Sequence, residues 1–480
     1  MKKVKKKAKR EVRKRTVKKI VKKAKEKVLT KEELIEKAKK PGEDALKLHP
    51  FYKGKVKITA KCAIRSFDDF AIWYTPGVAE PCKDIFRNPE KVWEHTNRGN
   101  LIAVLTDGTR VLGLGDIGPE ASLPVMEGKA LLFKYLGGVD AVPIAVGTKD
   151  PDKFIEVAKL LEPSFGGYNL EDIAQPKCFY ILDILRKELN IPVWHDDQQG
   201  TAAVTLAGLI NALKIVGKDV KKVRIGMIGA GAAGTACLRV MVAYGFDPAN
   251  IVMCDEYGII HKDRPDFEKH FPYTKDLISK TNAEGRKAEK LEDAIRITME
   301  DMDVVIGYSK PGPDTIKKEW IQRMAKDPIV FVCANPIPEI WPWEAKEAGA
   351  RIVATGRSDF PNQINNSLGF PGIFRGTLDV NARTITDEMC IAAAEELAKV
   401  AEDRGLREDY LIPTMDDWEV FPREAAAVGM KAIEQGVARI VMDRDSLYKK
   451  ALETIKEARK EIQFLMKKGL IKKPPKALLK

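Results

Sequence analysis

The stretch that decides the fold runs from Trp194-His-Asp-Asp-Gln-Gln-Gly-Thr201 to Val223-Arg-Ile-Gly-Met-Ile-Gly229-Ala-Gly-Ala-Ala-Gly234. Its second half is a short apolar run followed by Gly229, Gly231 and Gly234, the G-x-G-x-x-G spacing of a strand, a tight turn and a helix. The first glycine allows the turn, the second lets the backbone approach a pyrophosphate, and the third permits close helix packing. A phosphate there would accept hydrogen bonds from N–H groups at the helix N-terminus. The pattern predicts a Rossmann-type dinucleotide-binding domain.

An acidic residue ends the next predicted strand. Residues 251–254 are apolar, and Asp255 lies 21 residues after Gly234, where a dinucleotide fold places the carboxylate that binds a ribose hydroxyl. Because NADP carries a phosphate on that hydroxyl, Asp255 favours NAD. Lys262 and Arg264 follow closely and could accommodate the 2′-phosphate. The sequence therefore leans to NAD and leaves NADP open.

The composition indicates a globular protein with a basic extension. A chain of 480 residues with 44% hydrophobic residues can form two or three domains with ample core. Residues 1–40 hold 20 Lys/Arg and 5 Glu, so they account for the formal net charge of +13. We predict a basic helical or disordered extension over residues 1–44. Nucleic acid or another anionic surface is a possible partner only through residues 1–40.

Cysteine usage and hydropathy bear on the location of the protein. The seven cysteines are an odd number and form no C-x-x-C pair, which fits reduced thiols in a cytoplasmic protein. No apolar run approaches the roughly 18 residues that a membrane span needs. The N-terminus also lacks the apolar core of a secretory signal. We therefore predict a cytoplasmic protein with no membrane partner.

The half of the chain before residue 198 also alternates strand and helix patterns, which predicts a second α/β domain. Two apolar runs joined by Asp107-Gly108 predict a β-hairpin. A predicted helix beginning at Pro124 places Lys129 in its first turn. A cation there faces an unfavourable helix dipole unless a nearby charge compensates it. Lys129 is therefore a better functional candidate than most of the lysines.

Two acidic pairs, Glu171 with Asp172 and Asp196 with Asp197, lie at predicted loop ends. Each pair alone is typical of solvated loop charges. Together they offer an all-oxygen ligand set, which suits Mg²⁺ or Mn²⁺. Zinc is disfavoured because no Cys or His set has its ligand spacing. His195 is a single imidazole, and we interpret it as structural.

Four further polar residues have both an ordinary and a functional interpretation. Asn335 ends a predicted strand, at the end where doubly wound sheets bind ligands. Tyr74 is either a packed aromatic or a phenol presented by the Pro76-Gly77 turn. Arg110 is either a surface charge or a fork for a substrate carboxylate. Asn366 lies in a polar loop with ordinary turn chemistry.

Six motifs occur in a fixed order along the chain. They are Tyr74-Thr-Pro-Gly-Val-Ala-Glu-Pro-Cys82, Val111-Leu-Gly-Leu-Gly-Asp-Ile-Gly118, Pro124-Val-Met-Glu-Gly-Lys129, Leu161-Glu-Pro-Ser-Phe-Gly-Gly-Tyr-Asn-Leu-Glu-Asp172, His195-Asp-Asp-Gln-Gln-Gly-Thr-Ala202 and Gly356-Arg-Ser-Asp-Phe-Pro-Asn-Gln-Ile-Asn-Asn366. In this order the chain resembles the malic enzymes, in their short prokaryotic form, over roughly residues 45–435. The resemblance implies an α/β N-terminal catalytic domain (45–198) and a Rossmann NAD(P)-binding domain (199–440). Residues 441–480 lie outside the resemblance, and their own highly charged helical pattern predicts a C-terminal helical extension.

The resemblance also implies a role for each candidate residue. The family uses a divalent metal, a lysine base, a tyrosine acid and residues that bind malate and the nicotinamide. Carried over, Glu171, Asp172 and Asp197 ligate the metal, Lys129 is the general base, Tyr74 is the general acid, Asp196 orients or tunes Lys129, Arg110 binds a malate carboxylate, and Asn335 and Asn366 lie at the nicotinamide and the substrate.

The implied reaction is the oxidative decarboxylation of L-malate to pyruvate and CO₂ with NAD or NADP, in a homodimer or a multiple of dimers. Two alternatives stay open. An amino-acid dehydrogenase of similar two-domain plan would need no metal, so its activity would survive EDTA. A nucleic-acid-binding protein on a retired enzyme scaffold would instead depend on the basic residues 1–40.

Overall fold

The computed structural model describes residues 31–479 and forms two compact units. One unit contains α2 (Lys31–Tyr52) and the last residues from Lys472, where the Tyr52 hydroxyl donates a hydrogen bond of 2.8 Å to the Lys472 carbonyl oxygen. The other unit contains residues 55–471 and both sheets. The predicted basic extension lies largely outside the described residues.

The first sheet has the strand order β2-β1-β3-β4 and is parallel throughout. Its central strand is apolar on both faces: Ile102 and Val104 pack toward α6 and α16, whereas Ala103 and Leu105 pack toward α7 and α8. Burial of both faces is typical of a parallel strand flanked by helices. The bounds are β1 (Leu101–Thr106), α6 (Pro119–Gly137), β2 (Asp140–Ala145), α7 (Pro151–Leu161), β3 (Gly167–Leu170), α8 (Lys177–Glu188), β4 (Val193–His195) and α16 (Phe370–Asp379).

The second sheet has the order β10-β9-β8-β5-β6-β7, in which only β7 is antiparallel. From β5 the strand order runs to β6 and β7 on one side and then to β8, β9 and β10 on the other, as in a Rossmann fold. The glycine loop after β5 therefore lies at the topological switch point. This confirms the predicted dinucleotide-binding architecture. The strands are β5 (Ile225–Ile228), β6 (Ile251–Asp255), β7 (Gly258–Ile259), β8 (Val304–Gly307), β9 (Ile329–Val332) and β10 (Ile352–Thr355).

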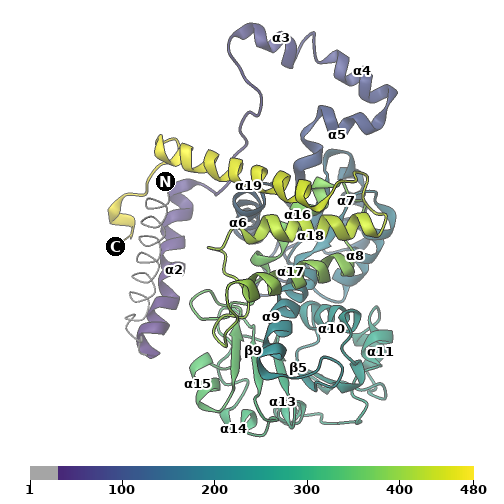
Figure 1. Cartoon of the computed structure of the whole chain (residues 1–480), viewed down its shortest axis with the longest axis vertical. Helices are drawn as coiled ribbons and strands as arrows, with labels where there is room; N and C mark the ends of the chain where they lie inside the picture. Colours follow the sequence, from purple (N-terminus) through teal and green to yellow (C-terminus); the bar gives the residue numbers. More distant parts are fainter. Residues whose placement is uncertain (1–30, 480) are drawn as a thin grey trace, which may run out of the picture. The chain divides into compact units, whose positions relative to one another are not determined.

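Helices cover both faces of the second sheet. One face packs against α9, α10 and α17, and the other against α13, α14 and α15, as Figure 1 shows. Their bounds are α9 (Thr201–Val216), α10 (Ala232–Tyr244), α11 (Phe267–His270), α12 (Lys275–Ile278), α13 (Leu291–Met299), α14 (Lys318–Ile321), α15 (Pro342–Glu347), α17 (Asp387–Asp403), α18 (Val420–Glu434) and α19 (Arg444–Lys467).

A buried helix joins the two sheets. Every residue of α16 is buried, and its aromatic side chains Phe370 and Phe374 pack on Phe133 of α6 at ring-centroid distances of 4.6 and 5.0 Å. An ion pair of 3.0 Å between Arg375 and Asp379 compensates the charges on this helix, and Lys450 of α19 lies 3.3 Å from Asp379. The C-terminal helix α19 is thereby attached to the core.

Two local predictions are wrong. The stretch around Asp107-Gly108 is no hairpin, because β1 takes parallel β2 and β3 as its hydrogen-bonding neighbours, and residues 107–118 form a loop closed by one bridge between Val111 and Gly115. Helix α6 begins at Pro119 rather than Pro124, since proline is well suited to a first turn. Lys129 therefore lies in the interior of the helix.

One helical stretch bears on the prediction of no membrane partner. Residues 196–216 form one continuous helical stretch of 21 residues with a mean hydropathy of 1.3, long and apolar enough to cross a membrane. In the structure, 78% of that window is buried inside the protein. We therefore interpret it as a core helix, because most of its residues are covered by other parts of the protein.

The aromatic contact between α6 and α16 should dominate local stability. Phe133 is fully buried, so Phe133→Ala should lower the free energy of unfolding by about 3–5 kcal/mol. Leu160→Ala is the matched control, since Leu160 is 74% exposed on α7. This substitution should change the free energy of unfolding by less than about 0.5 kcal/mol. Denaturant titration measures both, and an equal loss for the two variants would contradict this packing.

Candidate active site

The two acidic pairs meet at the carboxyl edge of the first sheet. Glu171 and Asp172 follow β3, and Asp196 and Asp197 begin the π-helical turn η5 (Asp196–Gly200) after β4. Because β3 and β4 are parallel neighbours, both pairs leave the same edge. Carboxylate oxygens of Glu171, Asp172 and Asp197 lie within 4.8 Å of one another, and the Asp172 N–H donates to Asp197 Oδ2 at 2.9 Å.

This carboxylate set fits a hard divalent cation. Burial raises the pKa of Glu171 and of Asp197, and burial together with the Asp197 charge raises the pKa of Asp172 to about 8. Asp172 Oδ2 is buried and has no hydrogen-bond partner among the described residues. Burial and mutual repulsion make the negatively charged forms of these three carboxylates unfavourable. A bound Mg²⁺ or Mn²⁺ would offset their negative charge, and both ions prefer oxygen ligands.

Lys129 lies beside these acids, on the buried face of α6. Its Nζ is 2.5 Å from Asp196 Oδ2 and 3.1 Å from Glu171 Oε1, and it lies 4.4 Å from the centroid of the Phe370 ring. Burial lowers the pKa of Lys129, but the charges of Asp196 and Glu171 outweigh burial and raise it overall. The carboxylates of Asp196 and Glu171 thus supply the compensating negative charge that the sequence analysis required for Lys129.

Asp196 is itself held in place. Its Oδ1 accepts a hydrogen bond of 3.1 Å from the Trp194 indole, and a methyl group built on Gly200 would lie 2.1 Å from the same oxygen and 3.2 Å from Asn366 Cβ. Gly200 therefore permits the close approach of η5 and the start of the turn Asn366–Leu368. This approach brings Asn366 beside the acid that contacts Lys129.

Arg110 is also at this edge of the sheet. Its backbone N–H donates to the Asp172 carbonyl oxygen at 2.9 Å, and its exposed guanidinium opposes the rise in the pKa of Asp197. His195 is fully buried, 3.9 Å from Asp197. Burial lowers the pKa of His195 to about 4, so its ring is neutral near pH 7, in keeping with a structural role.

The three glycines after β5 have the geometry of a dinucleotide loop. Gly229 has a φ of 108°, and a methyl group on Gly234 would lie 2.0 Å from the Gly229 carbonyl oxygen. A methyl group on Gly231, which precedes α10, would meet no described atom within 4 Å. The first glycine therefore serves the turn, the third serves close packing, and the second leaves its surroundings open, as a bound pyrophosphate requires.

Asp255 is at the predicted end of β6, and its carboxylate is already engaged. Both oxygens accept hydrogen bonds of 2.7 Å from the Arg264 guanidinium, and the Tyr257 N–H donates to Oδ1 at 2.9 Å. Arg264 is buried and also lies 2.6 Å from Asp266. Of the two cations considered for a 2′-phosphate, Arg264 is committed to these acids, whereas Lys262 is exposed.

Asn335 is exposed at the end of β9, on the dinucleotide side. Sequence reasoning missed the buried Glu339, whose carboxylate accepts N–H groups of Ala334 at 3.1 Å and of Ser309 at 3.0 Å. It also missed Asn169, which donates to Glu171 Oε2 at 2.8 Å. A single acid or amide in a strand or turn carries no spacing signal, so neither could be found from the sequence.

Tyr74 is not brought to this cluster by its own chain. It follows the short helix α3 (Phe70–Trp73), and its side chain is 72% exposed. In Figure 1, α3 and α4 (Ala79–Arg87) extend away from the two sheets of their unit. The described contacts include no hydrogen bond from the Tyr74 hydroxyl to any of the acids or to Lys129.

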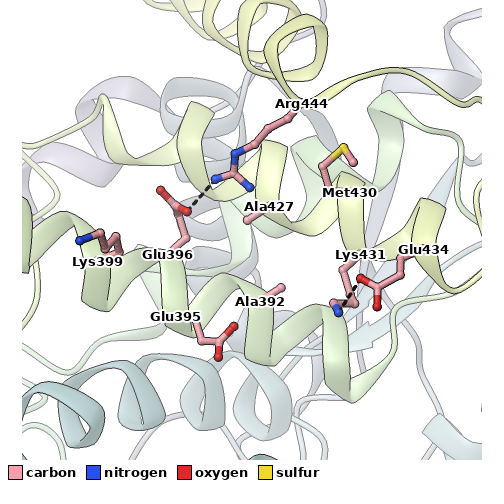
Figure 2. Close-up of a pocket in the computed structure, with 9 residues that line it drawn as sticks. All are labelled: Ala392, Glu395, Glu396, Lys399, Ala427, Met430, Lys431, Glu434 and Arg444. Atoms are coloured by element: carbon pink, nitrogen blue, oxygen red, sulfur yellow. Dashed lines mark hydrogen bonds and ion pairs between the residues drawn. The ribbon is translucent and has the colours of Figure 1, made fainter.

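A separate pocket of about 400 Å³ lies between α17, α18 and the start of α19 (Figure 2). Two ion pairs form within its lining: Arg444 lies 2.7 Å from Glu396, and Lys431 lies 2.7 Å from Glu434. The pocket contains none of the predicted site residues. The candidate catalytic and metal-binding residues therefore lie at the acid cluster and not in this pocket.

Comparison with known families agrees with this architecture. Residues 53–186 match the family model described as "Malic enzyme, N-terminal domain", and residues 198–434 match "Malic enzyme, NAD binding domain". The chain belongs to the malic enzyme family. It is thus an enzyme with a nicotinamide-binding domain, and the family predicted from the motifs is confirmed.

Curated malic enzymes resemble the chain over most of its length. It is 52% identical over 408 residues to the bifunctional malic/malolactic enzyme of Bacillus subtilis (strain 168), covering 85% of this chain and 97% of the relative. It is 49% identical to the NAD-dependent malic enzyme of Geobacillus stearothermophilus, covering 80% and 78%. It is 42% identical to the NADP-dependent malic enzyme of Escherichia coli (strain K12), covering 90% of this chain and 56% of that protein.

Solved malic enzyme structures share the fold. The malic enzyme of Entamoeba histolytica superposes with a TM-score of 0.90 at 48% identity, covering 96% of this chain and 95% of the other. The malic enzyme of Pyrococcus horikoshii Ot3 gives a TM-score of 0.84 at 50% identity, covering 88% and 98%. The predicted combination of an α/β N-terminal domain and a Rossmann-type domain is therefore confirmed.

The raised carboxylate pKa values predict how metal binding depends on pH. A cation at Asp172 must displace the proton held below about pH 8, so Mn²⁺ affinity should fall by roughly tenfold per pH unit below that value for one displaced proton. Titration calorimetry of the purified chain between about pH 6 and pH 8 measures the trend. Asp172→Asn should weaken binding at every pH, whereas Asp116→Asn, an exposed loop acid, should leave it unchanged. Binding that is independent of pH would contradict the site.

Proposed function

We propose that this malic enzyme family member oxidises and decarboxylates L-malate to pyruvate and CO₂ with reduction of NAD⁺ or NADP⁺. The observation that supports it best is the contact of the Lys129 amine with Asp196 and Glu171, next to three carboxylates that fit a divalent cation. Oxidation of an alcohol needs a base for the hydroxyl proton and an acceptor for the hydride. Lys129 and the nicotinamide supply them.

Glu171, Asp172 and Asp197 would hold Mg²⁺ or Mn²⁺. When bound, the ion would act as a Lewis acid toward the C2 oxygen and the adjoining carboxylate of malate. Its positive charge would also offset the carboxylates that keep the Lys129 pKa high. Lys129 would then be able to reach its neutral form, which a general base requires. Asp196, hydrogen-bonded to the amine, orients it toward the substrate.

The proton and the electron pairs can be followed through the reaction. Lys129 takes the C2 hydroxyl proton while the C2 hydride passes to the nicotinamide. The C3–C4 bond then breaks, CO₂ leaves, and C3 keeps the electron pair. A proton from Tyr74 to C3 completes pyruvate. Arg110 binds a malate carboxylate, and Asn335 and Asn366 position the nicotinamide and the substrate.

We further propose that Tyr74 acts in the site of a second copy of the chain, within a homodimer. The segment around it exposes large apolar side chains, which in a lone chain would contact water: Phe67 is 90% exposed, Trp73 48% and Phe86 89%. Contiguous exposed apolar surface marks an interaction site. A C2 dimer would bury the same segment of both copies and would deliver each tyrosine to its partner.

The remaining details follow the sequence expectations. NAD is the preferred cofactor, because Asp255 is in place and Arg264 is committed to acidic partners. The domain bounds 45–198 and 199–440 are supported by the two matched family segments. All seven cysteines are free thiols, which supports a cytoplasmic location. A nucleic-acid partner, if the protein has one, would bind through residues 1–40.

Removal of the base tests the proposal. Lys129→Ala should remain folded and lose malate oxidation by several orders of magnitude, followed at the nicotinamide absorbance with L-malate and Mn²⁺. Lys134→Ala is the matched control on the same helix, because Lys134 pairs with Asp140 and Glu461 near the surface. Near-normal turnover by Lys129→Ala would refute the assignment, and activity that survives EDTA would favour the metal-independent alternative.

Mixed dimers test where Tyr74 acts. Lys129→Ala and Tyr74→Phe chains, carrying different tags, should each be nearly inactive alone. The purified mixed dimer should recover activity, because the Tyr74→Phe chain keeps Lys129 and receives the intact tyrosine of its partner. If Tyr74 serves its own chain, both sites of the mixed dimer lack one group and no activity returns. A fully active monomer would also contradict the proposal.

A further inference from the structure

The loop from Asp107 to Gly118 is anchored on a predicted metal ligand. The Arg110 N–H donates to the Asp172 carbonyl oxygen at 2.9 Å, and the Leu112 N–H donates to Asp172 Oδ1 at 3.4 Å. Leu112 has a φ of 48°, a conformation that a non-glycine residue keeps only where its surroundings hold it. The loop therefore has a definite position relative to Asp172.

The tip of the same loop lies against the dinucleotide side of the site. A methyl group built on Gly113 would lie 2.7 Å from the Asn335 carbonyl oxygen and 2.9 Å from Pro311 Cγ, both closer than real side-chain contacts. Gly113 has no left-handed backbone, unlike Gly115 and Gly118, whose φ values are 82° and 85°. The lack of a side chain at 113 therefore serves the close approach of two loops and not a turn.

The Asn335 turn, which Gly113 contacts, is held in place by a buried carboxylate. Glu339 is fully buried, and its carboxylate accepts the N–H groups of Ala334 and Ser309 at 3.1 and 3.0 Å. These bonds connect the loops after β8 and β9. Asn335 thus lies between a fixed carboxylate on one side and the Gly113 loop on the other. A shift of the Gly113 loop must then either displace the Asn335 turn or break the contact.

We propose that residues 110–115 couple the metal and malate half of the site to the dinucleotide half, with Gly113 as the positioning residue of this contact. The identity of the ligands rests on the proposed function. A cation on Asp172 fixes one end of the loop, and a dinucleotide beside Asn335 fixes the other. Each ligand thereby strengthens binding of the other, and by linkage the two factors are equal.

Equilibrium binding of NADH to the full chain measures the coupling. Its dissociation constant is determined by NADH fluorescence, alone and with saturating Mn²⁺ and oxalate, a dianion that has no hydride to transfer. In the wild type, Mn²⁺ and oxalate should tighten NADH binding by at least about fivefold. In Gly113→Ala the ratio of the two dissociation constants should fall to less than about twofold, because the methyl group separates the loops.

Gly147→Ala is the matched control. Gly147 lies in the loop after β2 and has no left-handed backbone, and a methyl group there would meet no described atom within 4 Å. The ratio of NADH dissociation constants in this variant should therefore equal that of the wild type. Pro311→Ala is the second variant. It removes the ring from the contact without adding bulk and should also lower the ratio, which keeps the test decisive if Gly113→Ala fails to fold.

The outcomes separate this inference from the proposed function. If wild-type chain binds NADH and Mn²⁺ but shows the same NADH affinity with and without Mn²⁺ and oxalate, the coupling is wrong and the enzyme assignment stands. If Gly113→Ala and Pro311→Ala both keep the wild-type ratio of NADH dissociation constants, the contact does not couple the two halves of the site. Failure of the wild type to bind Mn²⁺, or to bind either NADH or NADPH, would instead overturn the proposed function.

Discussion

The buried contact between the Lys129 amine and the carboxylates of Asp196 and Glu171 is the interaction on which the rest of the structure depends. Charges removed from water are costly unless they are paired and hydrogen-bonded. Each feature of the fold around this contact supplies such a partner or fixes its position. Parallel β3 and β4 bring the acids to one edge, α6 carries the amine to them, and Gly200 lets the backbone of η5 approach closely.

The same contact explains why a divalent cation fits. With one amine among four acids, the cluster retains excess negative charge, and burial raises the carboxylate pKa values. A bound divalent ion would reduce that excess and, at the same time, weaken the attraction that keeps Lys129 protonated. Metal binding and activation of the base are therefore two results of one electrostatic balance. In this account, the acids serve both the ion and the lysine.

Much of this could be predicted from the sequence, because the relevant signals are local or periodic. The glycine spacing, the apolar strands and Asp255 predicted the dinucleotide domain, and the paired acids predicted where Glu171 and Asp197 would gather. The hairpin at Asp107 failed because strand pairing is decided by distant partners, here β2 and β3. The start of α6 was misplaced because two prolines both suit a first turn. The burial of Glu339 and the separation of Tyr74 from the acids of its own chain depend on tertiary structure alone, so no spacing in the sequence revealed them.

The central claim is that this cluster oxidises and decarboxylates a hydroxy diacid in one site. It is tested most directly by the stoichiometry of a single reaction, in which purified full chain, L-malate, Mn²⁺ and NAD⁺ are incubated and the reduced dinucleotide, pyruvate and CO₂ are quantified together. The account predicts equal amounts of the three products and none after EDTA. Reduced dinucleotide accompanied by oxaloacetate instead of pyruvate and CO₂, or no reduced dinucleotide with either NAD⁺ or NADP⁺, would contradict it.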